Sequence, residues 1–450
     1  MMNTTRKMFQ VRQGQYLLLF ACFSIAYMQR LDITVAIVAM TDRFSANPDF
    51  PEFPWDLKTK SKILSAFFWG YFILQIPGGV LARKFGPKPV LTTAIFVGSC
   101  ASLLIPKCAE FFDWPVVSAL QFIQGLSQGL VHPSVYTHIS QWSPVNERSR
   151  AVGIVFSGQQ FGSVICLLLT GHLASSVLGW PSVFYKSGIL GLLWTTAWLV
   201  WGAESPASHK TITLEERSFI GLNTAVTDKS EKVDSKIPWK AILTSRPVIV
   251  LSLANICNNW VFWSLVTLLP SFLSSVYGFN IKNNSYFSTL PHLSMFVLAI
   301  IFGAISDTIL RKKLLSVNAN RKLWNSVAQW GGAVAMFSIA IFRDSQTITL
   351  IMMTVGLAIN SAIYLGFISN PMDLSPNYAG ILMGLTNCLS NVASTLAPLF
   401  AGFIIKDEKN ADEWAIIFYT CAFILVFSNA VFLIFGSTKI QKWNSLKNVG

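Results

Sequence analysis

Charged residues are scarce in this chain. Only 12% of its 450 residues are Asp, Glu, Lys or Arg, and 52% are hydrophobic, whereas an ordinary soluble domain is roughly a quarter charged. Apolar stretches such as 16–40 and 414–436 are long enough, at about 20 residues or more, to span a hydrocarbon layer of ~30 Å. We therefore expect a polytopic membrane protein, which argues against cytosolic enzymes and nucleic-acid-binding proteins.

Cysteine is sparse and shows no pattern. Six of the seven cysteines fall in apolar stretches and only Cys108 falls in a predicted loop, so we expect neither an extracellular disulfide framework nor a metal site. No His, Asp and Ser cluster recurs either, which argues against the alternative of a membrane-embedded enzyme acting on lipid-linked substrates. We expect no cofactor, apart from Na⁺ or H⁺ as a coupling ion.

The apolar stretches predict twelve membrane-spanning helices. Six precede and six follow a polar stretch that is too hydrophilic to cross, with a short surface helix expected near 214–222. This divides the chain into an N-terminal six-helix bundle (1–203), a cytoplasmic linker (204–245) and a C-terminal six-helix bundle (246–450). The helices are expected at 16–40, 62–82, 89–106, 114–139, 151–176, 182–203, 246–270, 285–306, 323–342, 348–369, 378–404 and 414–436.

The positive charges predict the orientation. Of the 34 Lys and Arg residues, 23 lie on one side of the predicted spans, 9 lie on the other side, and Arg30 and Lys186 lie inside spans. Because Lys and Arg accumulate in cytoplasmic loops, both termini are expected in the cytoplasm. The charges form no contiguous basic face for nucleic acid, so the expected partners are membrane lipids and a small substrate.

The two halves of the chain repeat a short pattern. GVLARKFGPK follows the second predicted helix from Gly79, and GAISDTILRKK follows the eighth from Gly303. Each pattern places a glycine near a helix end and then basic residues in a tight loop. Two parallel six-helix repeats joined by a linker describe the major facilitator fold. The predicted fold class is therefore an all-α membrane protein with this fold.

Arg30 is the most informative single residue. It stands about 14 residues into the first helix, on the order of 20 Å from the cytoplasmic end, where an Arg costs at least ~2.5–3.5 kcal/mol unless it faces protein or water. It either pairs with a neighbouring helix or anchors an anionic substrate, and we favour the anchor because a guanidinium grips carboxylate or phosphate through two hydrogen bonds. Asp32 lies about 200° around the helix from Arg30, so it is expected to pair with another helix, bind a cation or carry a proton.

Polar residues also mark the fourth helix. Gln121, Gln124, Gln128 and His132 share one face, which predicts either a cavity lining or a helix contact. His132 is interpreted either as a hydrogen-bonded interior histidine or as a proton-coupling group. Pro133 removes a backbone donor, so a local kink is expected. Gln159 in helix 5 and the neutral wall of Asn255, Asn258 and Asn259 in helix 7 are expected to complete the site.

Several segments match a known pattern in order along the chain. They include YMQRLDITVAIVAM (27–40), SAFFWGYFILQIPGG (65–79), QGLSQG (124–129), WSPVNERSR (142–150), GWPSVFY (179–185) and MDLSPNYAG (372–380). Together they resemble the major facilitator anion–cation symporters, the family of sialin, the vesicular glutamate transporters and the type I sodium/phosphate cotransporters. The resemblance implies transport of organic or inorganic anions, with Arg30 at the substrate-associated position of helix 1.

The departures from that family are informative. Many members carry Arg where Gln121 stands and Glu where Gln128 stands, and the vesicular glutamate transporters carry His and Arg where Leu64 and Asn258 stand. These positions are neutral here, so the resemblance does not carry over a glutamate mechanism or proton coupling through a helix 4 Glu. Gln128 favours the phosphate and urate-like branch.

The resulting expectation is a secondary transporter of phosphate, urate-like or carboxylate anions that works by alternating access, coupled to Na⁺ or H⁺ or driven by the membrane potential. The alternatives are a sialin-like, proton-coupled exporter of acidic sugars or amino acids, and a channel-like anion leak. A functional monomer in the plasma membrane or in a vesicular or lysosomal membrane is expected. Substrate contacts are predicted for Tyr27, Arg30, Gln121, Gln124, Gln128, Gln159, Asn258 and Asn259, coupling for Asp32 and His132, and conformational roles for Gly79, Arg83, Gly86, Glu147, Arg148, Asp307 and Arg311.

Overall fold

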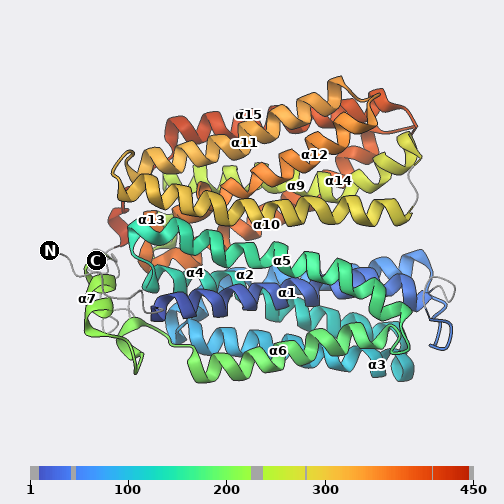
Figure 1. Ribbon diagram of the computed structural model, residues 1–450, viewed down its shortest axis with the longest axis horizontal. Helices are drawn as coiled ribbons and strands as arrows, with labels where there is room; N and C mark the ends of the chain where they lie inside the picture. Colours follow the sequence, from blue (N-terminus) through green and yellow to red (C-terminus); the bar gives the residue numbers. More distant parts are fainter. Residues whose placement is uncertain (1–9, 42–46, 224–236, 279–280, 408, 445–450) are drawn as a thin grey trace.

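The computed structural model describes residues 10–41, 47–223, 237–278, 281–407 and 409–444, and every regular element in these ranges is helical. Long helices run back and forth between the two ends of an elongated molecule (Figure 1). The first half of the chain contains α1 (Val11–Thr41), α2 (Leu57–Phe85), α3 (Pro87–Gly129), α4 (Val131–Trp142), α5 (Arg148–Ser175) and α6 (Pro181–Trp201). The second half contains α9 (Arg246–Tyr277), α10 (Ile281–Arg311), α11 (Val317–Ile341), α12 (Gln346–Asn360), α13 (Asn370–Leu374), α14 (Ala379–Ile404) and α15 (Ala411–Phe435).

The described residues contain nine stretches that are long and apolar enough to cross a membrane. One of them, Pro87–Trp142, is 56 residues long and reverses direction at Asp113, whose φ is 59°. Its two arms touch where the Gln124 side chain donates to the Gly98 carbonyl at 3.4 Å. With this hairpin counted as two crossings, and with α11 (25 residues) and α14 (26 residues) included, the helices account for the twelve expected crossings.

Local chemistry sets the ends of α2. The Asp56 carboxylate accepts a hydrogen bond from the Thr59 backbone N–H at 2.8 Å, which caps the first turn. Hydrogen bonds from the Thr59 side chain and from its backbone N–H lower the pKa of Asp56. At the other end, Gly86 has φ 89° and joins α2 to α3. This left-handed conformation favours glycine, and a Cβ atom at Gly86 would also displace the Glu204 side chain.

The structure differs from the expectation in one helix and in one loop. The predicted helix 348–369 is regular only as far as Asn360 and then continues as two short 3-10 turns, η5 (Ser361–Tyr364) and η6 (Phe367–Ser369). The loop expected at 107–113 is helical up to Asp113, so Cys108 lies in α3 and not in a loop. α3 gives way to α4 at Leu130, three residues before Pro133, and the Leu130 backbone keeps helical dihedral angles (φ −79°, ψ −21°), so the local kink expected near Pro133 stays a prediction.

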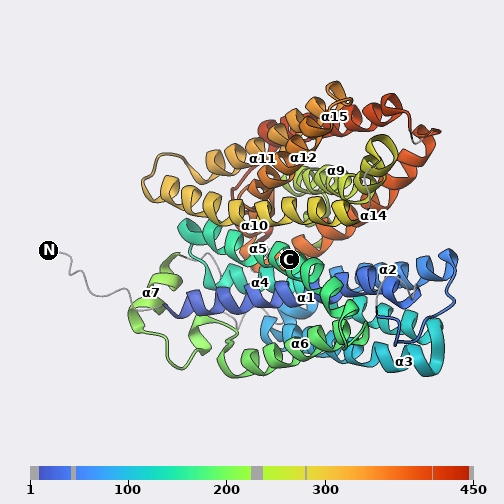
Figure 2. The same ribbon diagram turned by 45° about the vertical axis from the view of Figure 1, so that its right-hand side comes forward.

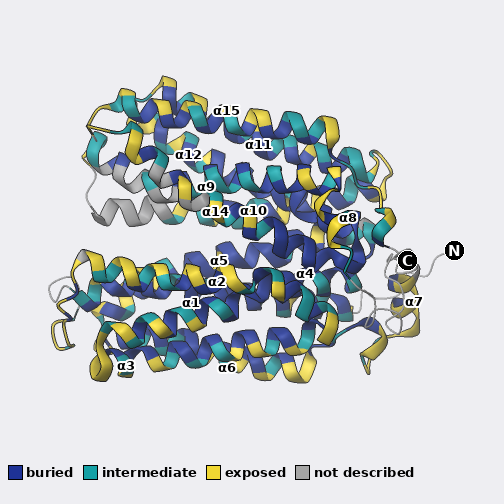
Figure 3. Cartoon of the chain, turned by 180° about the vertical axis from the view of Figure 1, so that it is seen from behind, coloured by how far each residue is buried: buried dark blue, intermediate teal, exposed yellow. Residues whose placement is uncertain are grey.

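The helices form two bundles that lie side by side (Figures 1 and 2). α1–α6 make one bundle and α9–α15 make the other, with α5 packed on α10 and α2 packed on α14. Buried residues gather where the bundles meet, whereas exposed residues cover their outer faces (Figure 3). The same pattern is expected of a membrane protein, whose outer faces meet lipid.

The surface helix expected at 214–222 is confirmed as α7 (Leu214–Asn223), followed by the short α8 (Trp239–Leu243). α7 lies at the end of the molecule where α1 begins, and Arg12 of α1 pairs with Glu216 of α7. We call this the linker end and the opposite one the far end.

Candidate functional site

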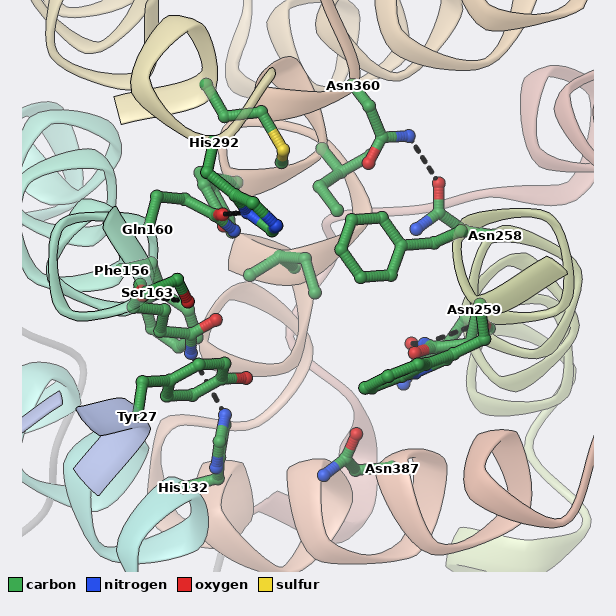
Figure 4. A pocket seen from close by; sticks show the side chains of 18 of the residues that line it. Tyr27, His132, Phe156, Gln160, Ser163, Asn258, Asn259, His292, Asn360 and Asn387 are labelled. Atoms are coloured by element: carbon green, nitrogen blue, oxygen red, sulfur yellow. Dashed lines mark hydrogen bonds between the residues drawn. The ribbon is translucent and has the colours of Figure 1, made fainter. Parts of the chain in front are cut away.

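A cavity of about 160 Å³ lies between the two bundles. A cavity needs only ~10–15 Å³ to hold one water molecule, so this one has room for several waters or a small solute. One bundle contributes α1, α4 and α5 to its wall, and the other contributes α9, α10, the η5–η6 turns and α14 (Figure 4). The polar lining consists of Tyr27, Arg30, His132, Gln159, Gln160, Ser163, Asn255, Asn258, Asn259, Trp263, His292, Asn360, Tyr364 and Asn387.

Arg30 supplies the permanent charge in the part of this lining that the structure describes. It is only 8% exposed, and no carboxylate among the described residues forms an ion pair with it. Aromatic rings surround the guanidinium carbon at 5.0–5.7 Å from their centres, namely those of Tyr27, Phe67, Phe68, Tyr71 and Trp263. Such rings stabilise a cation electrostatically, and the Tyr71 side chain also hydrogen-bonds with Arg30.

A chain of hydrogen bonds links both bundles beside Arg30. The amide of Asn387 on α14 donates to the Tyr71 hydroxyl at 3.1 Å, and this hydroxyl lies 3.2 Å from His132 Nδ1. The other ring nitrogen of His132 lies 3.0 Å from the Gln159 amide. Hydrogen bonds thus hold His132 on both sides. They connect Tyr71 of α2 to α4, α5 and α14.

Amides and hydroxyls form the opposite wall. Asn360 donates to the Asn258 side chain at 2.8 Å, and Asn259 donates to Asn255 at 2.6 Å. Gln160 reaches across from α5, donating to the Tyr364 hydroxyl at 3.2 Å and meeting His292 Nδ1 at 2.6 Å (Figure 4). Gln160, Asn360 and Tyr364 were not among the predicted contacts. Asn360 and Tyr364 lie where α12 gives way to the η5 turn, and irregular backbone at membrane depth occurs where it lines a cavity.

Three predicted substrate residues lie outside the cavity lining. Gln128 donates to the Ala26 carbonyl at 3.0 Å and Gln124 donates to the Gly98 carbonyl, so both serve helix contacts within the first bundle. Gln121 is fully buried and finds no hydrogen-bond partner among the described residues. Of the four residues on this shared face, His132 therefore lines the cavity, whereas the three glutamines lie away from it.

Asp32 also lies outside the cavity. Its carboxylate is fully buried and pairs with Lys186 of α6 at 3.1 Å. Of the roles left open for Asp32 by the sequence, the structure thus displays the pairing with another helix. The described residues contain no group of three or more His, Cys, Asp and Glu side chains that could hold a metal ion.

Four of the residues predicted to have conformational roles lie where the bundles meet at the linker end. Arg148 pairs with Asp373 at 2.7 Å, and Asp307 accepts the Arg150 backbone N–H at 3.1 Å. Arg83 lies 4.6 Å above the ring of Tyr378, and a Cβ atom on Gly79 would lie 2.7 Å from the Gly380 carbonyl oxygen.

The other three serve contacts of a single bundle. Gly86 meets Glu204, Glu147 pairs with Arg12 at 3.0 Å, and Arg311 donates to Thr308 within its own helix at 3.3 Å.

The bundle contact contains a buried charge cluster that was not predicted as such. Asp373 of α13 accepts from Arg148 of α5 and, at 2.7 Å, from Arg321 of α11. Arg321 also donates to Ser149 of the first bundle at 2.8 Å. All three charged side chains are at most 3% exposed. The three residues come from both halves of the chain, so the cluster forms only when the two bundles are placed against each other.

Comparison with known proteins identifies this arrangement. The sequence profile of the Major Facilitator Superfamily matches residues 18–398. The chain belongs to this superfamily. The fold of the proton:xylose symporter XylE superposes with a TM-score of 0.70 at 14% identity and covers 97% of this chain and 99% of XylE. The fucose transporter FucP in its outward conformation gives 0.60 at 14% identity, over 93% of this chain and 99% of FucP.

Relatives of higher identity place the chain in the anion–cation symporter group. It is 35% identical to the "Putative inorganic phosphate cotransporter" of Drosophila melanogaster, over 98% of this chain and 87% of the relative. It is 30% identical to human sialin, over 96% and 90%, and 32% identical to human vesicular glutamate transporter 2, over 94% and 73%. The chain is thus a multi-pass membrane transporter and not an enzyme.

Proposed function

We propose that this transporter carries small organic or inorganic anions, either phosphate, urate-like molecules or carboxylates, and that Arg30 binds their negative charge. The observation that carries the proposal is the buried Arg30 guanidinium, which faces the cavity without a carboxylate partner among the described residues. A buried charge is costly unless it is paired. An anion in the cavity would pair with this one through two parallel hydrogen bonds.

Alternating access follows from the two-bundle architecture. The hydrogen bonds between the bundles described above lie level with the cavity or toward the linker end, from the Asn387–Tyr71 bond to the Arg148–Asp373 pair. We assign this structure to the state that is closed at the linker end. Rocking of the bundles would break those contacts and expose the cavity on that side.

The orientation and the membrane belong to the proposal as well. The excess of Lys and Arg on one side supports cytoplasmic termini and a cytoplasmic linker. The far end would then face the outside of the cell or the lumen of a vesicle or lysosome, and a monomer would suffice because the cavity is built by one chain. Transport would be coupled to Na⁺ or H⁺ or be driven by the membrane potential, which contributes ~2.3 kcal/mol per charge at 100 mV.

A second candidate is proton-coupled export of acidic sugars or amino acids. It is favoured by His132, whose imidazole lines the cavity and hydrogen-bonds with both Tyr71 and Gln159. Human sialin is also among the relatives. Uptake that follows an imposed pH gradient and is lost in His132→Gln would favour this candidate over the first.

The decisive experiment is uptake by purified protein in liposomes. Phosphate, urate, sialate, glutamate and aromatic anions are offered while Na⁺, pH and voltage are varied independently. Arg30→Ala should abolish uptake of every transported anion, because no other permanent charge remains in the described lining. Arg30→Lys keeps the charge but loses the two-pronged hydrogen bond, so it should raise KM roughly ten- to hundredfold.

The matched control is Arg217→Ala, which removes an exposed arginine of α7. All variants are reconstituted in equal amounts, and each is first checked to elute as folded, monodisperse protein. Normal uptake by Arg30→Ala would overturn the proposed role. Unsaturable flux without stimulation by substrate on the opposite side would indicate the channel-like leak instead of a carrier.

A further inference from the structure

A second buried charge site lies inside the first bundle, outside the cavity. The Asp32 carboxylate of α1 is fully buried and its Oδ1 atom accepts from Lys186 Nζ of α6 at 3.1 Å. The same oxygen accepts from Cys166 Sγ of α5 at 3.3 Å. The Lys186 side chain is 14% exposed, so the ammonium lies on the side of this site that is closer to the protein surface.

The position of Asp32 gives its charge a consequence for the cavity. It follows Arg30 by two residues on the same helix, and an uncompensated carboxylate there would oppose the attraction of Arg30 for an anion. Lys186 is the charged group that faces Asp32. From α5 the neighbour is the uncharged Cys166, which itself contacts Thr170 at 3.5 Å, and α6 adds the hydroxyl of Ser187. The compensation among the described residues therefore comes from Lys186.

The contacts from Lys186 and Cys166 both fall on Oδ1, and Oδ2 is buried away from both of them. A buried carboxylate needs a counter-charge. A compact ammonium meets this need as a small monovalent cation would. If the ammonium is removed, the carboxylate must recruit a proton or a metal cation.

We propose that Asp32 is a monovalent-cation site whose natural occupant is the Lys186 ammonium of the same chain. The transporter thus brings its own counter-cation, and its anion moves without a Na⁺ or H⁺ taken up at Asp32. This inference rests on the proposed anion transport, but the site can be tested without a substrate.

The first test measures thermal unfolding of the purified full-length protein in NaCl and in choline chloride of equal ionic strength, at neutral and acidic pH. Lys186→Met should be less stable than the wild type and should regain stability with Na⁺ or with acid, because a bound cation stabilises the folded state. The wild type, Lys186→Arg and Asp32→Asn/Lys186→Met should show no such selective response. The double variant keeps the test valid if Lys186→Met alone folds poorly, because it removes both charges together.

The second test measures uptake of [³²P]phosphate, or of the best anion of the panel above, by the same variants in liposomes. Lys186→Met without Na⁺ at neutral pH should lose about a hundredfold in uptake and should recover with Na⁺ or acid, whereas Lys186→Arg and the double variant should transport without that requirement. A purely structural ion pair would change stability alone and leave the ion dependence of uptake unchanged.

The outcomes separate this inference from the proposed function. Absence of uptake by the wild type under every condition would refute the proposed function but leave the unfolding test in force. Ion responses of Lys186→Met equal to those of the wild type would overturn the Asp32 site. A Na⁺ or H⁺ dependence of the wild type that disappears in Asp32→Asn/Lys186→Met would overturn it too, because Asp32 would then take an external cation. If the double variant retains a Na⁺ or H⁺ dependence of the wild type, the external cation binds at another site. This outcome supports the inference, because Asp32 then takes no external cation.

Discussion

At the scale of single residues, Tyr71 connects more parts of the site than any of the predicted residues. It is 4% exposed, its ring covers Arg30, and its hydroxyl joins His132 to Asn387 across the two bundles. A side chain with these three contacts on three different helices connects the Arg30 guanidinium to the contact between the bundles.

Tyr71→Phe keeps the ring but removes this junction. The change leaves the Asn387 amide and one nitrogen of His132 without a partner, which should cost about 1–3 kcal/mol in the free energy of unfolding. Thermal unfolding of the purified protein measures it. Tyr27→Phe is the matched control, because the Tyr27 ring also covers Arg30 but its hydroxyl has no hydrogen bond in the described structure. Equal losses in both variants would show that the junction does not stabilise the site.

Some site residues could be found from the sequence because their chemistry is out of place. A charge or imidazole in an apolar helix, as at Arg30 and His132, must face protein or water. Helical periodicity, however, gives only a shared face and not its neighbour. Gln124 and Gln128 lie on the same face as His132 but meet α3 and α1. Gln160 and Tyr364 could not be selected, because each is an ordinary residue until the other half of the chain is placed opposite.

At the scale of elements, the sequence predicts where helices exist better than how they are interrupted. Hydropathy measures apolar length, and the whole stretch Gln346–Leu374 is apolar enough to be read as one crossing, so the change to 3-10 geometry after Asn360 leaves no trace in the pattern. That interruption is one that bears on function. It presents Asn360 and Tyr364 to the cavity from a crossing that would otherwise be a continuous helix.

The contact between α2 and α14 is a second element-scale feature, because it is made by backbone against backbone. A Cβ atom at Gly384 of α14 would lie 2.3 Å from the Gln75 carbonyl oxygen of α2, and one at Gly79 of α2 would lie 2.7 Å from the Gly380 carbonyl oxygen of α14. Carbonyl oxygens of helices cannot move aside as flexible side chains do. The close approach is therefore available only to glycine, and we expect it to be lost when the bundles separate at the linker end.

Gly384→Ala should accordingly disfavour the state that is closed at the linker end by about 1–3 kcal/mol, the usual cost of overpacking. Thr137 of α4 lies beside Gly380 of α14. We expect Thr137→Cys to react faster with a water-soluble maleimide when Gly384→Ala is added. Gly402→Ala is the control on the same helix, because nothing lies within 4 Å of its added Cβ atom. An unchanged alkylation rate in Gly384→Ala would contradict the assignment of the closed end.

At the scale of the whole molecule, the two bundles are held together at the linker end by charge as well as by close packing. The division at 204–245 remains a prediction, but the cluster of Arg148, Asp373 and Arg321 that bridges the bundles lies on α5, α13 and α11 and not in that stretch. Asp373 compensates two arginines at once. The cluster therefore carries an excess positive charge, and it tolerates burial only while both bundles contribute their hydrogen bonds.

Asp373→Asn tests whether this cluster closes the linker end. The change removes the acceptor charge and leaves Arg148 and Arg321 buried without compensation, which typically costs 3–5 kcal/mol. Separation of the bundles hydrates both arginines, so the closed state should lose most of this energy and the open state little. Alkylation of Thr137→Cys should accelerate and anion uptake should fall, whereas Asp344→Asn, a charge change in the exposed turn after α11, should alter neither. If Asp373→Asn instead lowers the unfolding temperature without faster alkylation, the cluster stabilises both states equally and does not act as the closure between the bundles.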